Sequence, residues 1–212
     1  MIQPELLGLA LAWLAFALLH SALASFAVKE RVARQWPTAA PWYRLAFNGL
    51  SLATVLPIVW LTYALEEPML WQWSGGWRWL SHALALTAIA GFVAVARWYD
   101  MSTFLGLRQI REHDRQPDGR EGFRLSPFHR HVRHPWYFFG LVLVWTGDKN
   151  LPLLISSIAI TAYFIVGSRL EEKKLLALHG DVYRRYMSRV PGLLPLPGKH
   201  LTPEEARRLA VD

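Results

Sequence analysis

The chain is organised around one stretch, Arg133-His134-Pro135-Trp136-Tyr137-Phe138-Phe139-Gly140, which runs directly into the apolar segment 141–145. Proline fixes its own φ and has no N–H, so Pro135 suits the first position of a helix. Arg133 and His134 therefore stand at a helix N-terminus, where backbone N–H groups and the helix dipole favour an anionic ligand group. A simpler interpretation is an interfacial arginine that anchors the helix end, and this stretch alone does not separate the two.

The composition indicates an integral membrane protein. Of the 212 residues, 53% are hydrophobic and 11 are tryptophan, and the apolar residues gather in long blocks. The sequence contains no cysteine, which excludes disulfides, zinc–thiolate sites and thiol nucleophiles. We therefore expect one unit, 1–212, of the all-α class. Its parts are three spans in 1–100, a loop at 101–133, a helical hairpin with a C-terminal helix in 134–195, and a tail at 196–212.

Five apolar segments predict five transmembrane helices. The fourth has only 12 residues, about 18 Å of helix against the ~30 Å of a bilayer core. We expect the last two segments to form a tight helical hairpin, which places His134 in a cavity inside the protein. Trp71, Trp73 and Trp77 are typical of an interfacial aromatic belt. The five segments are 6–28, 45–65 with Pro57 inside it, 79–96, 135–146 and 153–168.

The basic residues predict the orientation in the membrane. Segments 29–44, 97–133 and 169–212 hold 4, 8 and 9 of the 23 Lys and Arg residues, and only Arg78 and Lys149 lie elsewhere. The positive-inside rule then places these three segments in the cytoplasm and the N-terminus outside, in a bacterial inner membrane. The net charge of +7 thus reflects topology and anionic membrane lipids, and we expect no nucleic-acid partner.

A second polar cluster follows the fifth apolar segment, at Glu171-Glu172-Lys173-Lys174. Gly180 is expected to end that helix and Asp181 to cap a short cytoplasmic helix that ends at Val190-Pro191. Tyr183 and Tyr186 are three residues apart and share a face of it. The simpler interpretation of the glutamates is a solvated helix end. Carboxylates close to the hydrocarbon boundary are nevertheless costly without a partner, so we expect Arg133 and His134 to face them.

Three sets of residues carry a family resemblance: Arg133-His134-Pro135-x-Tyr137, Glu171-Glu172-x-x-Leu175, and Gly180-x-x-Tyr183-x-x-Tyr186-x-x-x-Val190-Pro191. Together they resemble the isoprenylcysteine carboxyl methyltransferases, a family of integral membrane enzymes. His20-Ser21 followed by Lys29, and Phe104-Leu105-Gly106-Leu107-Arg108-Gln109, are similar to the bacterial methanethiol S-methyltransferase branch of that family. Two departures concern the acceptor side: Phe139 stands where the family usually has glycine, and the chain is shorter than that branch.

The resemblance implies S-adenosylmethionine as the methyl donor, bound on the cytoplasmic side. It assigns His134, Pro135, Tyr137, Glu171, Glu172, Tyr183 and Tyr186 to the donor site. Arg108, Gln109 and Arg133 would face the acceptor and, with Glu172, form the catalytic set. The implied acceptor is a small or membrane-soluble thiol, with a prenylcysteine-type carboxylate or a lipid amine as alternatives. The residues leave open which of Glu171 and Glu172 faces inward, because helix neighbours point about 100° apart.

The residue types agree with methyl transfer from a sulfonium. An aromatic face at Tyr137 or Tyr183 attracts a sulfonium, and a nearby arginine lowers the pKa of a thiol. Two other interpretations stay open. His129-x-His131-x-x-His134 and His20 suggest haem or a metal, although we expect no acidic residue near the three loop histidines, which lie in a basic loop. A non-catalytic membrane scaffold also explains the spans and charges, but not two polar clusters on one face.

Overall fold

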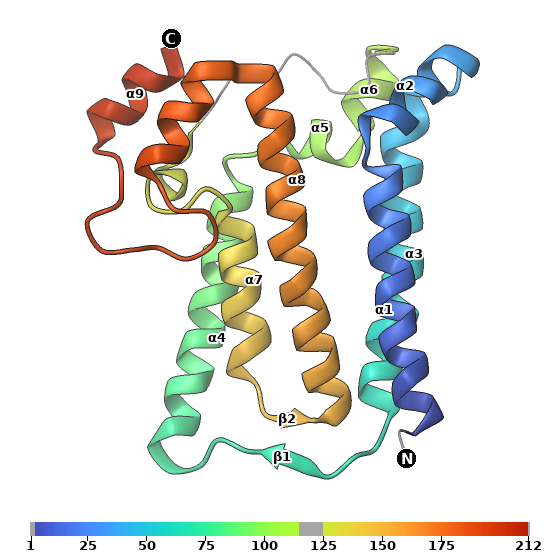
Figure 1. Ribbon diagram of the computed structural model, residues 1–212, viewed down its shortest axis with the longest axis vertical. Helices are drawn as coiled ribbons and strands as arrows, with labels where there is room; N and C mark the ends of the chain where they lie inside the picture. Colours follow the sequence, from blue (N-terminus) through green and yellow to red (C-terminus); the bar gives the residue numbers. More distant parts are fainter. Residues whose placement is uncertain (1–2, 115–124, 212) are drawn as a thin grey trace. The chain divides into compact units, whose positions relative to one another are not determined.

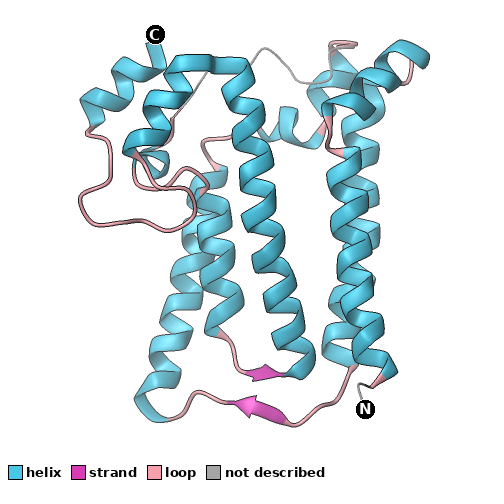
Figure 2. Cartoon of the chain, viewed as in Figure 1, coloured by secondary structure: helices cyan, strands magenta, loops and turns pink. Residues whose placement is uncertain are grey.

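The computed structural model describes residues 3–114 and 125–211, and this part of the chain is mainly helical (Figure 2). Arg115, Arg120 and Arg124 of the predicted cytoplasmic loop lie outside the described residues. Two compact units interleave along the sequence. The first comprises the described residues of Met1–Gln72, Tyr99–Arg120 and Asp148–Ala159. The second comprises those of Trp73–Trp98, Glu121–Gly147 and Ile160–Asp212.

In the first unit, α1 (Pro4–Leu23) and α3 (Tyr43–Ala64) lie side by side (Figure 1). The Trp13 face of α1 is buried, whereas Leu7, Leu11, Leu14 and Leu18, at helical spacing, are 51–64% exposed. A helix that is apolar on its exposed face as well as its buried face suits a lipid environment. Pro57 lies inside α3, as the sequence predicts.

The first predicted span, 6–28, is wrong at its C-terminal end. Helix α1 stops at Leu23, and the Ser25 side chain accepts a hydrogen bond from the Val28 N–H at 3.4 Å to start α2 (Phe26–Gln35). A serine N-cap satisfies an otherwise unpaired N–H, so it begins a new helix within an apolar run. A short 3-10 helix, η1 (Ala40–Trp42), then leads into α3.

The first unit also contains short elements that the sequence analysis does not predict. Helices α5 (Met101–Leu105) and α6 (Leu107–Arg111) meet at Gly106, whose φ of +92° suits glycine. A Cβ there would lie 2.7 Å from the Leu45 backbone nitrogen, so the bend also needs glycine for space. Strands β1 (Met69–Trp71) and β2 (Lys149–Asn150) pair antiparallel.

In the second unit, α4 (Gly75–Ala96) packs against α7 (Pro135–Thr146). The family departure at Phe139 has a structural explanation here. A Cβ on Gly91 of α4 would lie 2.3 Å from the Phe139 ring, so the glycine on one helix makes room for the phenylalanine on the other. The Trp136 and Phe92 rings stack nearby, with centroids 5.3 Å apart.

Helix α8 (Leu151–Arg189) is longer than the predicted fifth span and is broken at Gly180, whose φ is +53° and ψ −125°. The break is where the sequence predicts a helix end. After α8 the chain loops back to α9 (Pro203–Val211), an element the sequence analysis assigns to the tail. Residues from the end of α8 to the start of α9 form a small core: Tyr183, Tyr186, Val190, Leu201 and Ala206. The 3-10 helix η2 (Pro127–Arg130) lies close to α9.

In the part of the chain that the structure describes, four helical segments are long and apolar enough to cross a membrane: Pro4–Leu23, Ala40–Ala64, Gly75–Ala96 and Leu151–Arg189. The fourth predicted span is a helix with the predicted bounds, Pro135–Thr146, but its 12 residues leave it short of that length. The predicted mainly helical architecture is therefore confirmed, with four candidate membrane-spanning helices. The count of five spans stays a prediction.

The contact between Gly91 and Phe139 predicts that Gly91→Ala lowers stability. Overpacking of this kind costs about 1–3 kcal/mol, which thermal unfolding of the detergent-solubilised protein would register as a lower midpoint. In a protein that already carries Phe139→Ala, adding Gly91→Ala should lower the midpoint much less, because the clash disappears. Gly8→Ala on α1 is the matched control, since a Cβ there meets nothing within 4 Å. Equal midpoints for Gly91→Ala and Gly8→Ala would contradict this packing.

Candidate functional site

The site begins at the N-terminus of α7. Pro135 is the first helical residue, as predicted, and His134 is the N-cap. The backbone N–H groups of Arg133 and His134 donate to the carbonyls of Pro191 and Gly192, at 2.8 and 3.1 Å. These two amides are therefore used within the protein and do not serve the anion binding expected of a free helix N-terminus.

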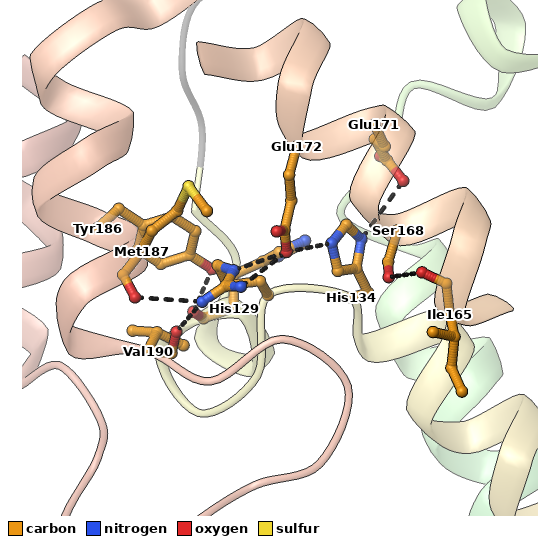
Figure 3. A network of polar contacts seen from close by, with 10 residues as sticks. His129, His134, Ile165, Ser168, Glu171, Glu172, Tyr186, Met187 and Val190 are labelled. Carbon is orange, nitrogen blue, oxygen red and sulfur yellow. Dashed lines mark hydrogen bonds and ion pairs between the residues drawn. The ribbon is translucent and has the colours of Figure 1, made fainter.

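Four charged side chains meet beside this helix end, and we refer to Arg133, His134, Glu171 and Glu172 as the charged cluster. Figure 3 labels the histidine and the two glutamates. Arg133 binds Oε1 of Glu172 through Nε at 2.9 Å and through Nη2 at 2.8 Å. His134 contacts the same oxygen through Nε2 at 3.0 Å and Glu171 Oε2 through Nδ1 at 3.3 Å. The predicted approach of the two polar clusters is thus what the structure shows.

Both glutamates take part, but they differ in exposure. The Glu172 side chain is 12% exposed and the Glu171 side chain 49%. Neighbouring helix positions point in different directions, and the His134 ring lies between the two carboxylates with one nitrogen towards each (Figure 3). Glu172 is therefore the buried member of the cluster, a point that the sequence leaves open.

The cluster favours the charged form of His134. Burial by itself lowers the pKa of this imidazole, but the hydrogen bonds to Glu171 and Glu172 and the negative charges of both carboxylates outweigh it, so the pKa is raised. Both ring nitrogens face acceptors, and only an imidazolium has two N–H donors. With His134 protonated, two positive charges balance two negative ones.

The predicted tyrosines lie close to the cluster but are packed within the protein. Tyr137 stacks on His134, with centroids 5.3 Å apart, and on Phe164, at 4.6 Å. Tyr183 and Tyr186 share a face, as predicted, with 1% and 2% exposure. The Tyr186 hydroxyl donates to the His129 carbonyl at 2.6 Å. Their roles in donor binding stay predictions.

The three loop histidines have separate partners. His129 Nδ1 contacts the Ser126 hydroxyl at 2.7 Å, His131 stacks on His200, and His134 belongs to the charged cluster. The statement that these histidines have no acidic neighbour is wrong for His134, because residues distant in sequence supply Glu171 and Glu172. Within residues 3–114 and 125–211, no group of three or more His, Cys, Asp or Glu side chains has an arrangement suited to a metal ion.

Arg108 and Gln109 belong to the first unit. Arg108 pairs with Glu112 at 2.9 Å and approaches Asp100 at 3.7 Å, and its side chain is half exposed. The Gln109 Nε2 donates to the Thr103 carbonyl at 3.2 Å, while its Oε1 is buried and accepts no hydrogen bond within the described chain. The assignment of both residues to the acceptor side stays a prediction.

Sequence reasoning misses the C-terminal contribution to the site. The Met187 and Val190 carbonyls accept hydrogen bonds from Arg133, and Gly192 lies so close that a Cβ would be 3.3 Å from Arg133 Nη2. Backbone carbonyls have no sequence signature. The start of α9 does have one, because Thr202 and Glu205 form reciprocal hydrogen bonds of the capping-box type.

Sequence comparison relates the chain to several curated methyltransferases. The chain is 30% identical to a methanethiol S-methyltransferase of Crocosphaera subtropica over 190 residues, covering 84% of this chain and 73% of that protein. It is 31% identical over 184 residues to methanethiol S-methyltransferase 2 of Bradyrhizobium diazoefficiens, covering 85% and 69%. The chain belongs to the methanethiol S-methyltransferase family. A Mycobacterium tuberculosis member of this family is 38% identical over a shorter stretch of 97 residues, 45% of this chain and 40% of that protein. No family model and no solved structure matches the chain.

The low pKa of His129 predicts that the fold loses stability in acid. Burial, together with the charge of His134, lowers the pKa of His129 from 6.5 to about 4. The unfolded chain therefore binds this proton at a higher pH than the folded chain, so stability is complete above pH 6.5 and falls as the pH drops towards 4. At about 1.4 kcal/mol for each pKa unit, the loss reaches roughly 3 kcal/mol.

Thermal midpoints at pH 7 and pH 5 test this prediction. His129→Gln keeps a neutral acceptor near Ser126 and should flatten the decrease between the two pH values, with His134, Glu171 and Glu172 unchanged. His82→Gln, at an exposed position of α4, is the matched control and should decrease as the wild type does. An equal decrease in His129→Gln would show that another group causes the acid sensitivity.

Proposed function

We propose that the protein is an S-adenosylmethionine-dependent membrane methyltransferase that methylates a small or membrane-soluble thiol. The observation that carries the proposal is the similarity of most of the chain to proteins named methanethiol S-methyltransferases. The charged cluster supports it, because it combines a buried and an accessible carboxylate with two cationic side chains. The distribution of Lys and Arg along the sequence predicts that this cluster lies at the cytoplasmic ends of the spans. A prenylcysteine-type carboxylate and a lipid amine are the alternative acceptors.

The residues of the cluster suit a ligand with both amino and hydroxyl donors. Glu171 is half exposed and Glu172 has one carboxylate oxygen that makes no hydrogen bond or ion pair within the described residues. Such oxygens accept charge-assisted hydrogen bonds from an ammonium group or from ribose hydroxyls. His134, Pro135, Tyr137, Tyr183 and Tyr186 complete the proposed donor site around them.

The bound donor supplies a methyl group on a positively charged sulfur. In the transfer, the acceptor thiol would give up its proton to water and its sulfur would form a new bond to the methyl carbon. The donor's sulfur–methyl bond would break at the same time, and its electron pair would stay on the donor sulfur. The protein contributes mainly by holding the two reactants in line, which lowers the activation barrier by several kcal/mol. We assign Arg108 and Gln109 to the acceptor side on the strength of the family resemblance.

The same proposal includes the topology. We propose five spans in the bacterial inner membrane, with Pro135–Thr146 as the short fourth span and α7 and α8 as a hairpin. Contacts in the second unit support the hairpin, since Trp145 donates to Thr161 at 2.9 Å and Tyr137 stacks on Phe164. The N-terminus is outside, the charged cluster and the C-terminus are cytoplasmic, and membrane lipids surround the spans.

Calorimetric binding of S-adenosylmethionine to the detergent-purified protein tests the donor. Wild type should bind at micromolar concentration, and Glu172→Gln and His134→Ala should each weaken binding about 10- to 100-fold, as expected for charged hydrogen-bonding groups. Glu204→Gln, an exposed glutamate of α9, is the matched control and should bind as wild type does. Folded wild-type protein that binds no donor would refute the proposed function.

The acceptor is identified with isotopically labelled methyl donor and a panel of candidate acceptors. Incorporation of label into a small thiol, detected as the thioether by mass spectrometry, is the expected result. If label appears only in a prenylcysteine analogue or only in phosphatidylethanolamine, that compound's class is the methyl acceptor and the thiol assignment is wrong. Glu172→Gln should lose the activity with every acceptor, because it acts on the donor that all of them share.

The absence of cysteine from the sequence makes a direct test of orientation possible. Ser74→Cys and Ser188→Cys are matched single substitutions at exposed serines, one before α4 and one near the end of α8. A membrane-impermeant maleimide added to intact spheroplasts should label the cysteine at 74 and not the one at 188, and both after lysis. The opposite pattern would reverse the proposed orientation.

A further inference from the structure

The guanidinium of Arg133 is almost entirely engaged inside the protein. Its Nε and Nη2 both bind one oxygen of Glu172, and its Nη1 donates to the Met187 carbonyl at 3.1 Å and to the Val190 carbonyl. These contacts occupy four of the five N–H donors that an arginine carries. With the side chain 12% exposed, little of Arg133 is left for a substrate to contact.

The two carbonyl partners of Arg133 stand at the end of α8, which stops at Arg189. The last carbonyls of a helix have no intrahelical partner, and a positive charge there is favourable. Backbone hydrogen bonds from Arg133 and His134 to Pro191 and Gly192 add to the same connection. Arg133 therefore joins the start of α7, the end of α8 and the carboxylate of Glu172 in one place.

The distribution of donors around Glu172 is uneven. Three nitrogen atoms, two from Arg133 and one from His134, gather at Oε1. Oε2 makes no hydrogen bond or ion pair with any residue that the structure describes, and it is not among the buried side-chain atoms that lack a partner. A carboxylate held through one oxygen cannot rotate freely, so its second oxygen points in a fixed direction.

We propose that Arg133 is a positioning residue for donor binding and does not contact the methyl acceptor. By holding Glu172 through Oε1, it directs Oε2 towards the ammonium group or the ribose hydroxyls of the methyl donor. This inference rests on the proposed function and reassigns Arg133, which the family resemblance places on the acceptor side. Arginine suits the role better than lysine, because its planar fork binds the carboxylate and the helix end at once.

A double-mutant cycle on the dissociation constant of S-adenosylmethionine tests the proposal. Arg133→Gln and Glu172→Gln should each weaken donor binding by about tenfold or more. Arg133→Gln/Glu172→Gln should bind no more than about threefold more weakly than Glu172→Gln alone, because the effect of Arg133 passes through Glu172. The proposal would be overturned if the double variant lost affinity by the product of the two single losses. It would also be overturned if Arg133→Gln raised the KM of the thiol acceptor and left the donor dissociation constant unchanged.

Two further variants separate positioning from general loss of structure. Arg130→Gln removes a hydrogen bond of 3.0 Å to the Leu201 carbonyl, in the same C-terminal segment, without touching Glu172, and should leave donor binding unchanged. Gly192→Ala places a Cβ 3.3 Å from Arg133 Nη2 and should weaken donor binding several-fold in a folded protein. Weakened donor binding in Arg130→Gln, or normal binding in Gly192→Ala, would count against Arg133 as the positioning residue.

The outcomes for the two proposals are distinct. Folded wild-type protein that binds no S-adenosylmethionine refutes the proposed function and, with it, the positioning role of Arg133. If the wild-type protein binds the donor and the fold-losses in affinity of the two substitutions multiply in the double variant, the proposed function stands and only the role of Arg133 is refuted. If Arg133→Gln does not fold, Arg133→Lys keeps the charge without the fork and should bind the donor more weakly than wild type, with kcat reduced less than affinity.

Discussion

Glu172 places a negative charge where only 12% of its side chain reaches solvent, and the surrounding contacts in the second unit follow from that constraint. Removing a carboxylate from water costs several kcal/mol unless charge and hydrogen bonds replace the lost hydration. Arg133 and His134 supply both. Because Arg133 also binds the last carbonyls of α8, and Arg133 and His134 donate their N–H groups to Pro191 and Gly192, the partners of one carboxylate hold two helix ends together.

The C-terminal part of the second unit is arranged so that these partners stay in place. Tyr183, Tyr186 and Val190 form its hydrophobic core with residues at and before α9, and the Tyr186 hydroxyl bonds the His129 carbonyl ahead of α7. The Leu201 N–H donates to the Arg130 carbonyl, and the Arg130 side chain donates to the Leu201 carbonyl. These contacts hold the backbone partners of Arg133 in place, and groups fixed before a ligand binds help to orient it for reaction.

Sequence patterns predicted the features that depend on local chemistry. Long apolar runs predicted α1, α3, α4 and α7, and Pro135 and Gly180 marked a helix start and a helix break at the right residues. The approach of the two polar clusters was predicted from the cost of an unpaired carboxylate near lipid. The predicted first span extends too far for a local reason as well: the residues around Ser25 are apolar, so little in the sequence indicates that Ser25 caps a new helix.

The remaining features depend on contacts between residues far apart in the chain. Phe139 departs from the family pattern, and only the structure shows that Gly91, 48 positions earlier in the sequence, provides its space. Arg133 offers a sharper case, because its residue type and its place in the motif agree equally well with binding an acceptor and with holding Glu172. What separates these roles is the number of its donors already satisfied by backbone carbonyls. A carbonyl has the same chemistry in every residue, so no sequence pattern marks it, and the role of such an arginine becomes visible only when its partners are counted in three dimensions.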